Sequence, residues 1–131
     1  MKIALVVAVG ALLAASSVHA AGAPRTVLAI AFYPKGMSEP EVVHYSLRCG
    51  PAGGTVPDPK LACQALLGLA HPFKPTPPGT FCTGLAMGPE EATVKGRVRG
   101  ASVWAHLSVQ GGCEINRWRR VAVIVPGFPN R

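Results

Sequence analysis

Hydrophobic and polar residues alternate along several segments of this chain, and a period of two is typical of half-buried β-strands. Residues 26–33 are almost entirely apolar, lie between two prolines, and predict a first strand. Residues 41–49 alternate and predict a second strand, and residues 92–98 and 101–109 predict two more. Residues 119–125 (RRVAVIV) are rich in β-branched side chains and predict the last strand.

The alternation gives each strand an apolar inner face and an outer face that points to solvent. His44 and His106 fall on outer faces, where we expect surface residues rather than catalytic bases. Gly96 predicts a β-bulge, and Arg99-Gly100 predicts a tight turn between the third and fourth strands.

One segment has the spacing of a helix instead of a strand. Asp58 can cap free backbone amides and Pro59 suits the first helical position, so a helix is predicted to begin there. Apolar residues then recur at helical spacing as far as residue 69, and Cys63 falls on the buried side. Five strands with one or two short helices predict an α+β fold on a five-stranded antiparallel sheet.

The first twenty residues have the pattern of a secretory signal peptide. Lys2 precedes an apolar run over residues 3–15, and residues 18–20 (VHA) place small side chains where signal peptidase cleaves. The run is shorter than the ~20 apolar residues that a membrane span needs. We therefore expect a secreted, extracellular protein in which residues 1–20 are removed and residues 21–131 form one domain.

The charge balance of residues 21–131 is basic. Lys2 is one of 13 basic residues, so 12 remain against 6 acidic residues, a net charge of +6. The charges are scattered, and the one dense cluster is Arg117, Arg119 and Arg120 around Trp118. We interpret this cluster as a solvated face and expect no nucleic-acid or membrane partner.

Four cysteines lie within the predicted domain: Cys49, Cys63, Cys82 and Cys113. An even number behind a secretion signal predicts two disulfides formed in an oxidising compartment. Zinc sites prefer close C-x-x-C pairs, which this sequence lacks. Three pairings are open at this point. If neighbours in sequence are joined, each bridge would stabilise the fold by about 3–3.5 kcal/mol.

The remaining polar residues do not form a catalytic pattern. Each histidine of the predicted domain stands alone in its segment, and the neighbours Glu90 and Glu91 would point to opposite faces of a strand. The motifs of serine hydrolases, zinc proteases and phosphate-binding loops are missing from the sequence. We expect no enzymatic activity, no metal and no cofactor.

A single segment, residues 82–89 (CTGLAMGP), has the pattern of a binding loop. Leu85, Ala86 and Met87 are apolar or small, yet the glycines and proline around them disfavour a buried strand. We therefore expect this apolar tip to face solvent, as binding sites on constrained loops do. The other members of the predicted loop are Thr83, Gly84, Gly88 and Pro89.

Four segments carry a more specific pattern at matching cysteine spacing. They are residues 45–57 (YSLRCGPAGGTVP) with 61–66 (LACQAL), residues 81–82 followed by Gly88-Pro89, residues 94–104 (VKGRVRGASVW), and residues 113–116 (CEIN). Together they resemble the Streptomyces subtilisin inhibitor family, also called subtilisin inhibitor-like proteins. The resemblance extends from about residue 27 to residue 125.

The resemblance implies an α+β sandwich, the disulfides Cys49–Cys63 and Cys82–Cys113, and frequently a homodimer formed through the sheet. It also implies reversible, substrate-like inhibition of a serine endopeptidase of the subtilisin type, or sometimes of a chymotrypsin-like or trypsin-like one. Such an inhibitor offers one rigid loop to the protease as a poor substrate, and little ordering entropy is lost on binding.

The same resemblance implies which peptide bond is presented. Counting back from Pro89 places the reactive bond at Leu85–Ala86, with Leu85 as the specificity residue. Counting forward from Cys82 gives Gly84 instead, because this chain has one extra residue in the interval. We expect Leu85, since a glycine would leave the specificity pocket of the protease empty.

Two other functions are consistent with the sequence. The first is a secreted binding module that keeps this scaffold without inhibiting a protease, as the extra residue and Gly84 suggest. The second is a cationic protein that binds acidic surfaces through residues 117–120, although no amphipathic helix is predicted there.

Overall fold

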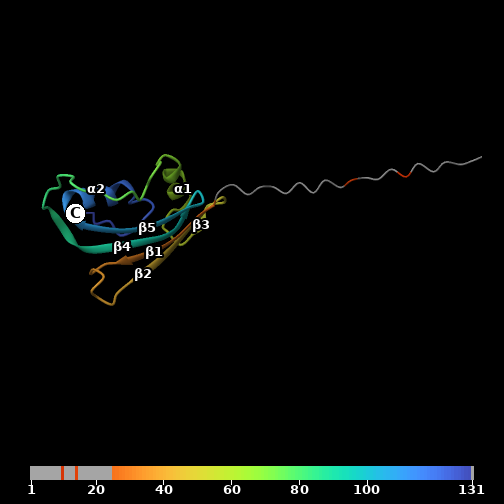
Figure 1. Ribbon diagram of the computed structural model, residues 1–131. Helices are drawn as coiled ribbons and strands as arrows, with labels where there is room; N and C mark the ends of the chain where they lie inside the picture. Colours follow the sequence, from red (N-terminus) through yellow and green to blue (C-terminus); the bar gives the residue numbers. More distant parts are fainter. Residues whose placement is uncertain (1–9, 11–13, 15–24, 131) are drawn as a thin grey trace, which may run out of the picture.

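A computed structural model describes residues 10, 14 and 25–130 of the chain. Residues 25–130 form a five-stranded antiparallel sheet of order β3-β2-β1-β4-β5 and two helices, an α+β fold (Figure 1). The elements in chain order are β1 (Thr26–Tyr33), β2 (Val43–Cys49), β3 (Gly53–Gly54), α1 (Pro59–Leu67), β4 (Ala86–Val98), β5 (Ala101–Gln110) and α2 (Gly112–Arg120).

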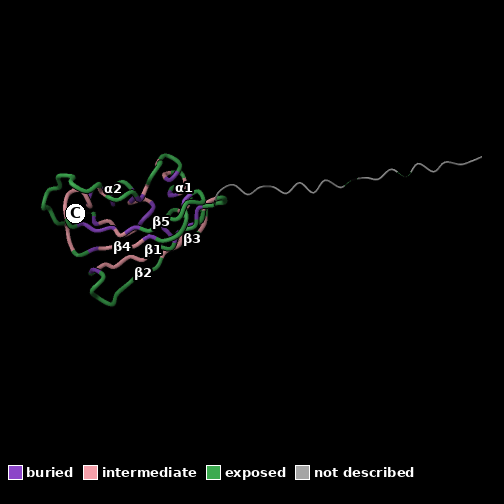
Figure 2. The backbone as a smooth tube through the Cα atoms, in the orientation of Figure 1, coloured by how far each residue is buried: buried purple, intermediate pink, exposed green. Residues whose placement is uncertain are grey.

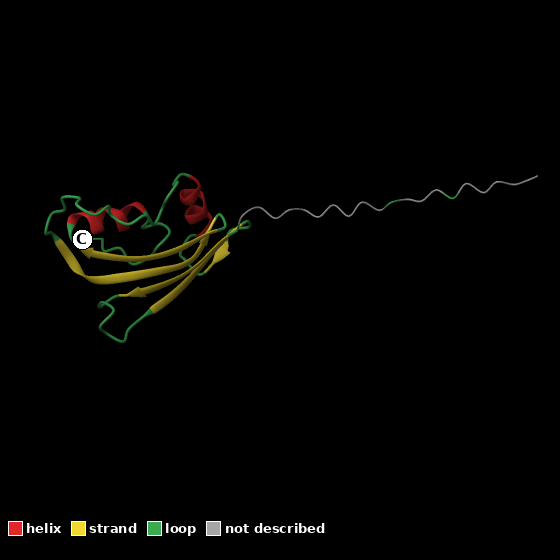
Figure 3. Cartoon of the chain, viewed as in Figure 1, coloured by secondary structure: helices red, strands yellow, loops and turns green. Residues whose placement is uncertain are grey.

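Both helices lie on one face of the curved sheet (Figure 3), and the core lies between these two layers (Figure 2). Leu28, Leu47 and Leu107 are fully buried on the strands, and Trp118 from α2 is the largest fully buried side chain. The opposite face of the sheet carries no helix and exposes large side chains such as Trp104, of which 64% is exposed.

The predictions for the first, second and fourth strands are confirmed to within a few residues. The third strand, predicted at residues 92–98, ends as expected but begins earlier, at Ala86. β4 and β5 pair from Glu91↔Ser108 to Val98↔Ala101, which leaves Arg99 and Gly100 as a two-residue turn. Arg99 has φ +48° and Gly100 φ +83°, as a hairpin turn that follows the sheet twist requires.

The prediction of a last strand at residues 119–125 is wrong. α2 continues through Arg120, and the following residues form successive turns in which the Ile124 and Val125 amides donate to the Val121 carbonyl. The indole of Trp118 donates to the Val125 carbonyl at 3.0 Å. Val121, Ile124 and Val125 are buried in this turn, so tertiary packing overrides the preference of their side chains for a strand. The fifth strand is instead the short β3, in a segment for which the sequence predicts no strand.

Gly96 does not form a bulge, so that prediction is wrong as well. It pairs in register with Leu28 and Val103, at φ +143°. A Cβ atom at this position would collide with the Val27 carbonyl, so glycine permits a close approach between β4 and β1. The irregularity in β4 lies nearer its start, between Ala86 and Glu91.

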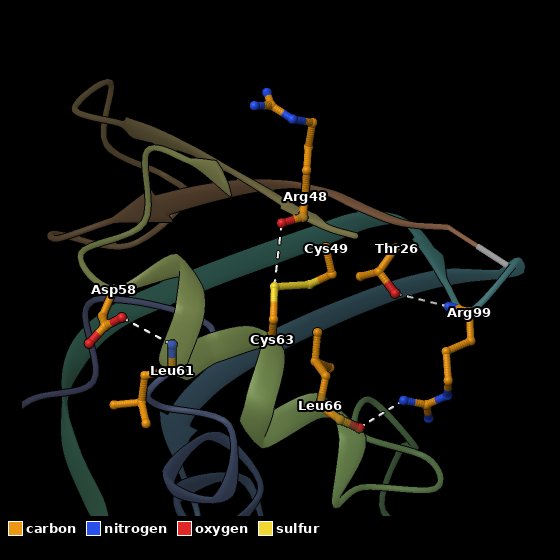
Figure 4. The surroundings of a disulfide bond; sticks show 8 residues. All are labelled: Thr26, Arg48, Cys49, Asp58, Leu61, Cys63, Leu66 and Arg99. Carbon is orange, nitrogen blue, oxygen red and sulfur yellow. Dashed lines mark hydrogen bonds between the residues drawn. A yellow bond between two sulfur atoms is a disulfide. The ribbon is translucent and has the colours of Figure 1, made fainter. Parts of the chain in front are cut away.

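Helix α1 begins where the sequence predicts. The Asp58 carboxylate accepts from the Leu61 amide at 3.0 Å, and Pro59 is the first helical residue. At the other end, the Arg99 guanidinium donates to the Leu66 carbonyl at 2.7 Å (Figure 4). It also donates to the Leu69 carbonyl, just after the helix, at 2.7 Å. The β4–β5 turn therefore supplies the donors that the last turn of α1 lacks.

The disulfide pairing implied by the resemblance is confirmed. Cys63 on α1 is bonded to Cys49 at the end of β2 (Figure 4), and Cys82 is bonded to Cys113 at the start of α2. Two disulfides are compatible with an extracellular protein. The predicted signal peptide, residues 1–20, lies almost entirely outside the described residues. Within the described part of the chain, no helix is long and apolar enough to cross a membrane.

Candidate functional site

The prediction of a loop over residues 82–89 is confirmed only as far as Leu85, because β4 begins at Ala86 and includes Met87, Gly88 and Pro89. This segment lies beside the start of α2, at the end of the sheet away from α1 (Figure 1). Residues 80–86 are all exposed, and Leu85 keeps 60% of its surface accessible. Met87 differs from the prediction because it is half-buried against the core. Within residues 82–89, the apolar residues that face solvent are therefore Leu85 and Ala86.

A disulfide fixes one end of this loop. Cys82 is joined to Cys113, with 5.4 Å between their Cα atoms, and Cys113 is the second residue of α2. α2 is held in the core by Ile115 and Trp118, which are 3% and 0% exposed. The loop therefore begins from a point bonded to a helix whose inner face is buried in the core.

Three consecutive residues, which we call the 110–112 brace, hold the rest of the loop through backbone carbonyls. The Gly112 amide donates to the Thr83 carbonyl at 3.0 Å, and the Gly111 amide donates to the Leu85 carbonyl at 2.6 Å. The Gln110 side-chain amide donates to the Gly88 carbonyl at 2.5 Å. These bonds and the disulfide restrict the loop backbone, while the Leu85 side chain stays exposed.

The two glycines of the brace allow this close approach. A Cβ atom on Gly112 would collide with the Thr83 hydroxyl. Gly111 has φ +99°, a backbone conformation that residues with a side chain rarely adopt. These two positions are not among the predicted site residues. The signal that could have identified them is a Gly-Gly pair directly before a cysteine, which is typical of a tight turn.

The Arg117 side chain is buried, so the prediction of a solvated arginine cluster is wrong for this residue. Only 7% of Arg117 is exposed, and its guanidinium donates to the carbonyls of Phe73 (3.0 Å), Lys74 (3.0 Å) and His106 (2.8 Å). It also forms an ion pair with Glu114 at 3.2 Å. Arg119 and Arg120 remain exposed.

This arginine contributes indirectly to the candidate site. It joins α2 to β5 and to the proline-rich segment at residues 72–78 (PFKPTPP), which precedes the loop in sequence. Glu114 extends the connection, because its carboxylate also accepts from the Thr76 hydroxyl at 3.2 Å. Arg117 is thus a positioning residue for α2 and the adjoining brace. A helical i, i+3 spacing of Glu114 and Arg117 could have indicated the pair.

The histidines, and the acidic residues other than Glu90, make no side-chain hydrogen bond or ion pair with residues 83–86 in the described part of the chain. His106 Nε2 contacts Glu91 Oε1 at 2.9 Å on the outer face of the sheet, so His106 is paired rather than alone. Glu90 is buried whereas its neighbour Glu91 is half-exposed, in agreement with their predicted opposite faces. Within residues 25–130, no group of three or more histidine, cysteine or acidic side chains could hold a metal ion.

The sequence matches no model of a known protein family, and no curated protein is similar to it. The resemblance to subtilisin inhibitor-like proteins therefore stays a prediction from the four sequence segments.

Proposed function

We propose that this chain is a secreted inhibitor of serine endopeptidases that presents residues 82–89 as a substrate-like loop. The observation that carries this proposal is an exposed apolar tip on a backbone that residues 110–113 hold at several points. Leu85 is 60% exposed, the disulfide Cys82–Cys113 holds one end, and the 110–112 brace binds three loop carbonyls. The motif resemblance supports the same function.

The physical basis is preorganisation. A flexible peptide loses conformational entropy when a protease binds it in an extended form, whereas a braced loop has already lost that entropy on folding. After the serine of the protease attacks, the disulfide and the brace keep the two new chain ends close together, so religation competes with release. Such complexes bury an ordinary ~1,600 Å² and are still among the tightest known.

The alternative hypothesis, a cationic protein that binds acidic surfaces, is weakened because Arg117 is buried. Only Arg119 and Arg120 of the predicted arginine cluster are exposed. The homodimer implied by the resemblance would use the outer face of the sheet. That face exposes Val27 on β1 and Trp104 on β5, which are 49% and 64% accessible. Dimerisation through it stays a prediction.

The test is a titration of the purified, disulfide-bonded protein against subtilisin, chymotrypsin, trypsin and elastase. We expect stoichiometric loss of activity of at least one of these proteases, unchanged between low and physiological salt because the contact is apolar. Mass spectrometry should find the chain intact or in equilibrium with a singly cut form. Rapid cutting within the loop by proteases that all stay fully active would refute the proposal.

A further inference from the structure

The carbonyl groups on either side of Gly84 are both bound by the 110–112 brace. Thr83 accepts from the Gly112 amide at 3.0 Å and Leu85 accepts from the Gly111 amide at 2.6 Å. Successive carbonyls of an extended segment point in opposite directions. The Gly84 carbonyl therefore points away from the brace, and within residues 25–130 it accepts no hydrogen bond.

The direction of a carbonyl decides whether a serine protease can attack it. The oxygen must enter the oxyanion hole, whose N–H donors lie about 2.7–3.1 Å from the developing negative charge. The Leu85 carbonyl faces the Gly111 amide, so the oxyanion hole could reach it only after that hydrogen bond breaks. The Gly84 carbonyl is already turned outward. We propose that the presented bond is Gly84–Leu85, and that the partner is a serine protease with a shallow primary pocket.

This inference rests on the proposed function and changes the bond that motif alignment favours. In the reaction, the seryl oxygen of the protease forms an ester with the Gly84 carbonyl carbon and the bond from that carbon to the Leu85 nitrogen breaks. The Leu85 amine leaves with a proton delivered by the protease histidine. Because Gly112 holds Thr83 and Gly111 holds Leu85, the amine stays beside the ester and can reform the peptide bond.

Glycine at position 84 determines which kind of primary pocket the protease partner can have. A glycine contributes no side chain to the primary pocket, so a protease with a deep pocket gains nothing there, whereas a pocket that is already filled or shallow loses nothing. The backbone does not require glycine at this position. A Cβ atom built on Gly84 meets no atom within 4 Å, and its φ lies outside the left-handed region. A side chain can therefore be added without strain.

Lysine scanning of the loop tests the proposal, because trypsin requires a cation in its primary pocket. The variants Gly84→Lys, Leu85→Lys and Ala86→Lys differ only in the position of the charge, and each is a matched control for the others. We expect Gly84→Lys alone to gain trypsin inhibition, by roughly 100-fold or more over the unmodified protein, since it forms a buried charge pair. A gain confined to Leu85→Lys or to Ala86→Lys would overturn the proposal and leave the inhibitory function standing.

The unmodified protein supplies a second readout that does not depend on inhibition strength. After long incubation with a small amount of a target protease, the cut chain stays joined through Cys82–Cys113 and separates on reduction. We expect mass spectrometry to identify Leu85 as the new amino-terminal residue, and Ala86 or Met87 there would contradict the assignment. If no variant gains trypsin inhibition and no protease in the panel is inhibited, both the assignment and the proposed function fail.

Discussion

Replacing Arg117 by methionine should destabilise the fold more than any exposed substitution on the same helix. Methionine keeps an unbranched apolar side chain that can pack where the arginine stem lies, but removes the guanidinium. The change therefore isolates the polar contacts of Arg117. They join α2 to β5 at the His106 carbonyl and to the proline-rich segment at the Phe73 and Lys74 carbonyls.

The magnitude follows from what the guanidinium leaves behind. A hydrogen bond to a charged group contributes about 1.5–3 kcal/mol, and three carbonyls would lose such a donor. The Lys74 residue is exposed, so water can replace part of its loss, whereas Phe73 is 6% exposed. The Glu114 side chain is 28% accessible, which reduces the value of the ion pair. We expect Arg117→Met to lower the free energy of unfolding by about 3–5 kcal/mol.

Two matched variants separate the carbonyl contacts from the charge. Glu114→Gln removes the ionic partner of Arg117 but keeps an oxygen that can accept, and should cost below about 1 kcal/mol. Arg119→Met removes an exposed arginine two positions along α2 that lies 5.5 Å from the Phe128 ring centroid. It should cost about 0.5–1 kcal/mol.

The assay is equilibrium unfolding in urea, followed by tryptophan fluorescence with the disulfides intact. Trp104 is 64% exposed and responds little to unfolding, so all variants are made in a Trp104→Phe background that leaves the buried Trp118 as the reporter. If Arg117→Met loses less than about 1 kcal/mol with an unchanged denaturant slope, the three carbonyl contacts do not stabilise the fold as argued.

Three further predictions concern the loop and the sheet. Replacing Cys82 and Cys113 by serine should turn the inhibitor into a substrate, seen as rapid cutting of the loop by mass spectrometry; continued stoichiometric inhibition would contradict the role of the bridge. Gly96→Ala should cost about 1–3 kcal/mol, because φ is +143° and the added methyl group meets the Val27 carbonyl; an unchanged melting temperature would refute this. Arg99→Asn keeps a residue that tolerates φ +48° but removes the hydrogen bonds from the guanidinium to the carbonyls at the end of α1. It should lower the free energy of unfolding in urea by about 1–2 kcal/mol, and an unchanged value would show that these hydrogen bonds do not stabilise the fold.

Much of the fold could be predicted because its signals are local. Period-two alternation places β1, β2 and β5 to within a few residues, and the second half of β4, since one face of each strand is buried and the other is not. The first residues of β4 were missed because Gly88 and Pro89 are typical of loops. The start of α1 follows from Asp58 and Pro59, whose capping chemistry acts within one turn. Four cysteines imply two bridges, although the pairing came from the motif resemblance rather than from their spacing.

The candidate loop could be located from the sequence, but its orientation could not. The apolar pair Leu85-Ala86 between a cysteine and a Gly-Pro pair indicates an exposed tip, and the structure places both residues at the surface. Which carbonyl faces outward depends on Gly111 and Gly112, about 25 residues further along the chain, and only the folded backbone brings them to the loop.

The sequence by itself determines the features that depend on residues close together in the chain. These are the alternation of strand faces, the helix cap, the tight turn and the presence of a constrained apolar tip. The tertiary structure alone decided that residues 121–125 turn around Trp118 instead of forming a strand, and that Arg117 is buried while Arg119 is not. The physical reason is the same in both cases. Burial against distant residues is worth more than local propensity, and an arginine can be buried where backbone carbonyls from other segments satisfy its donors.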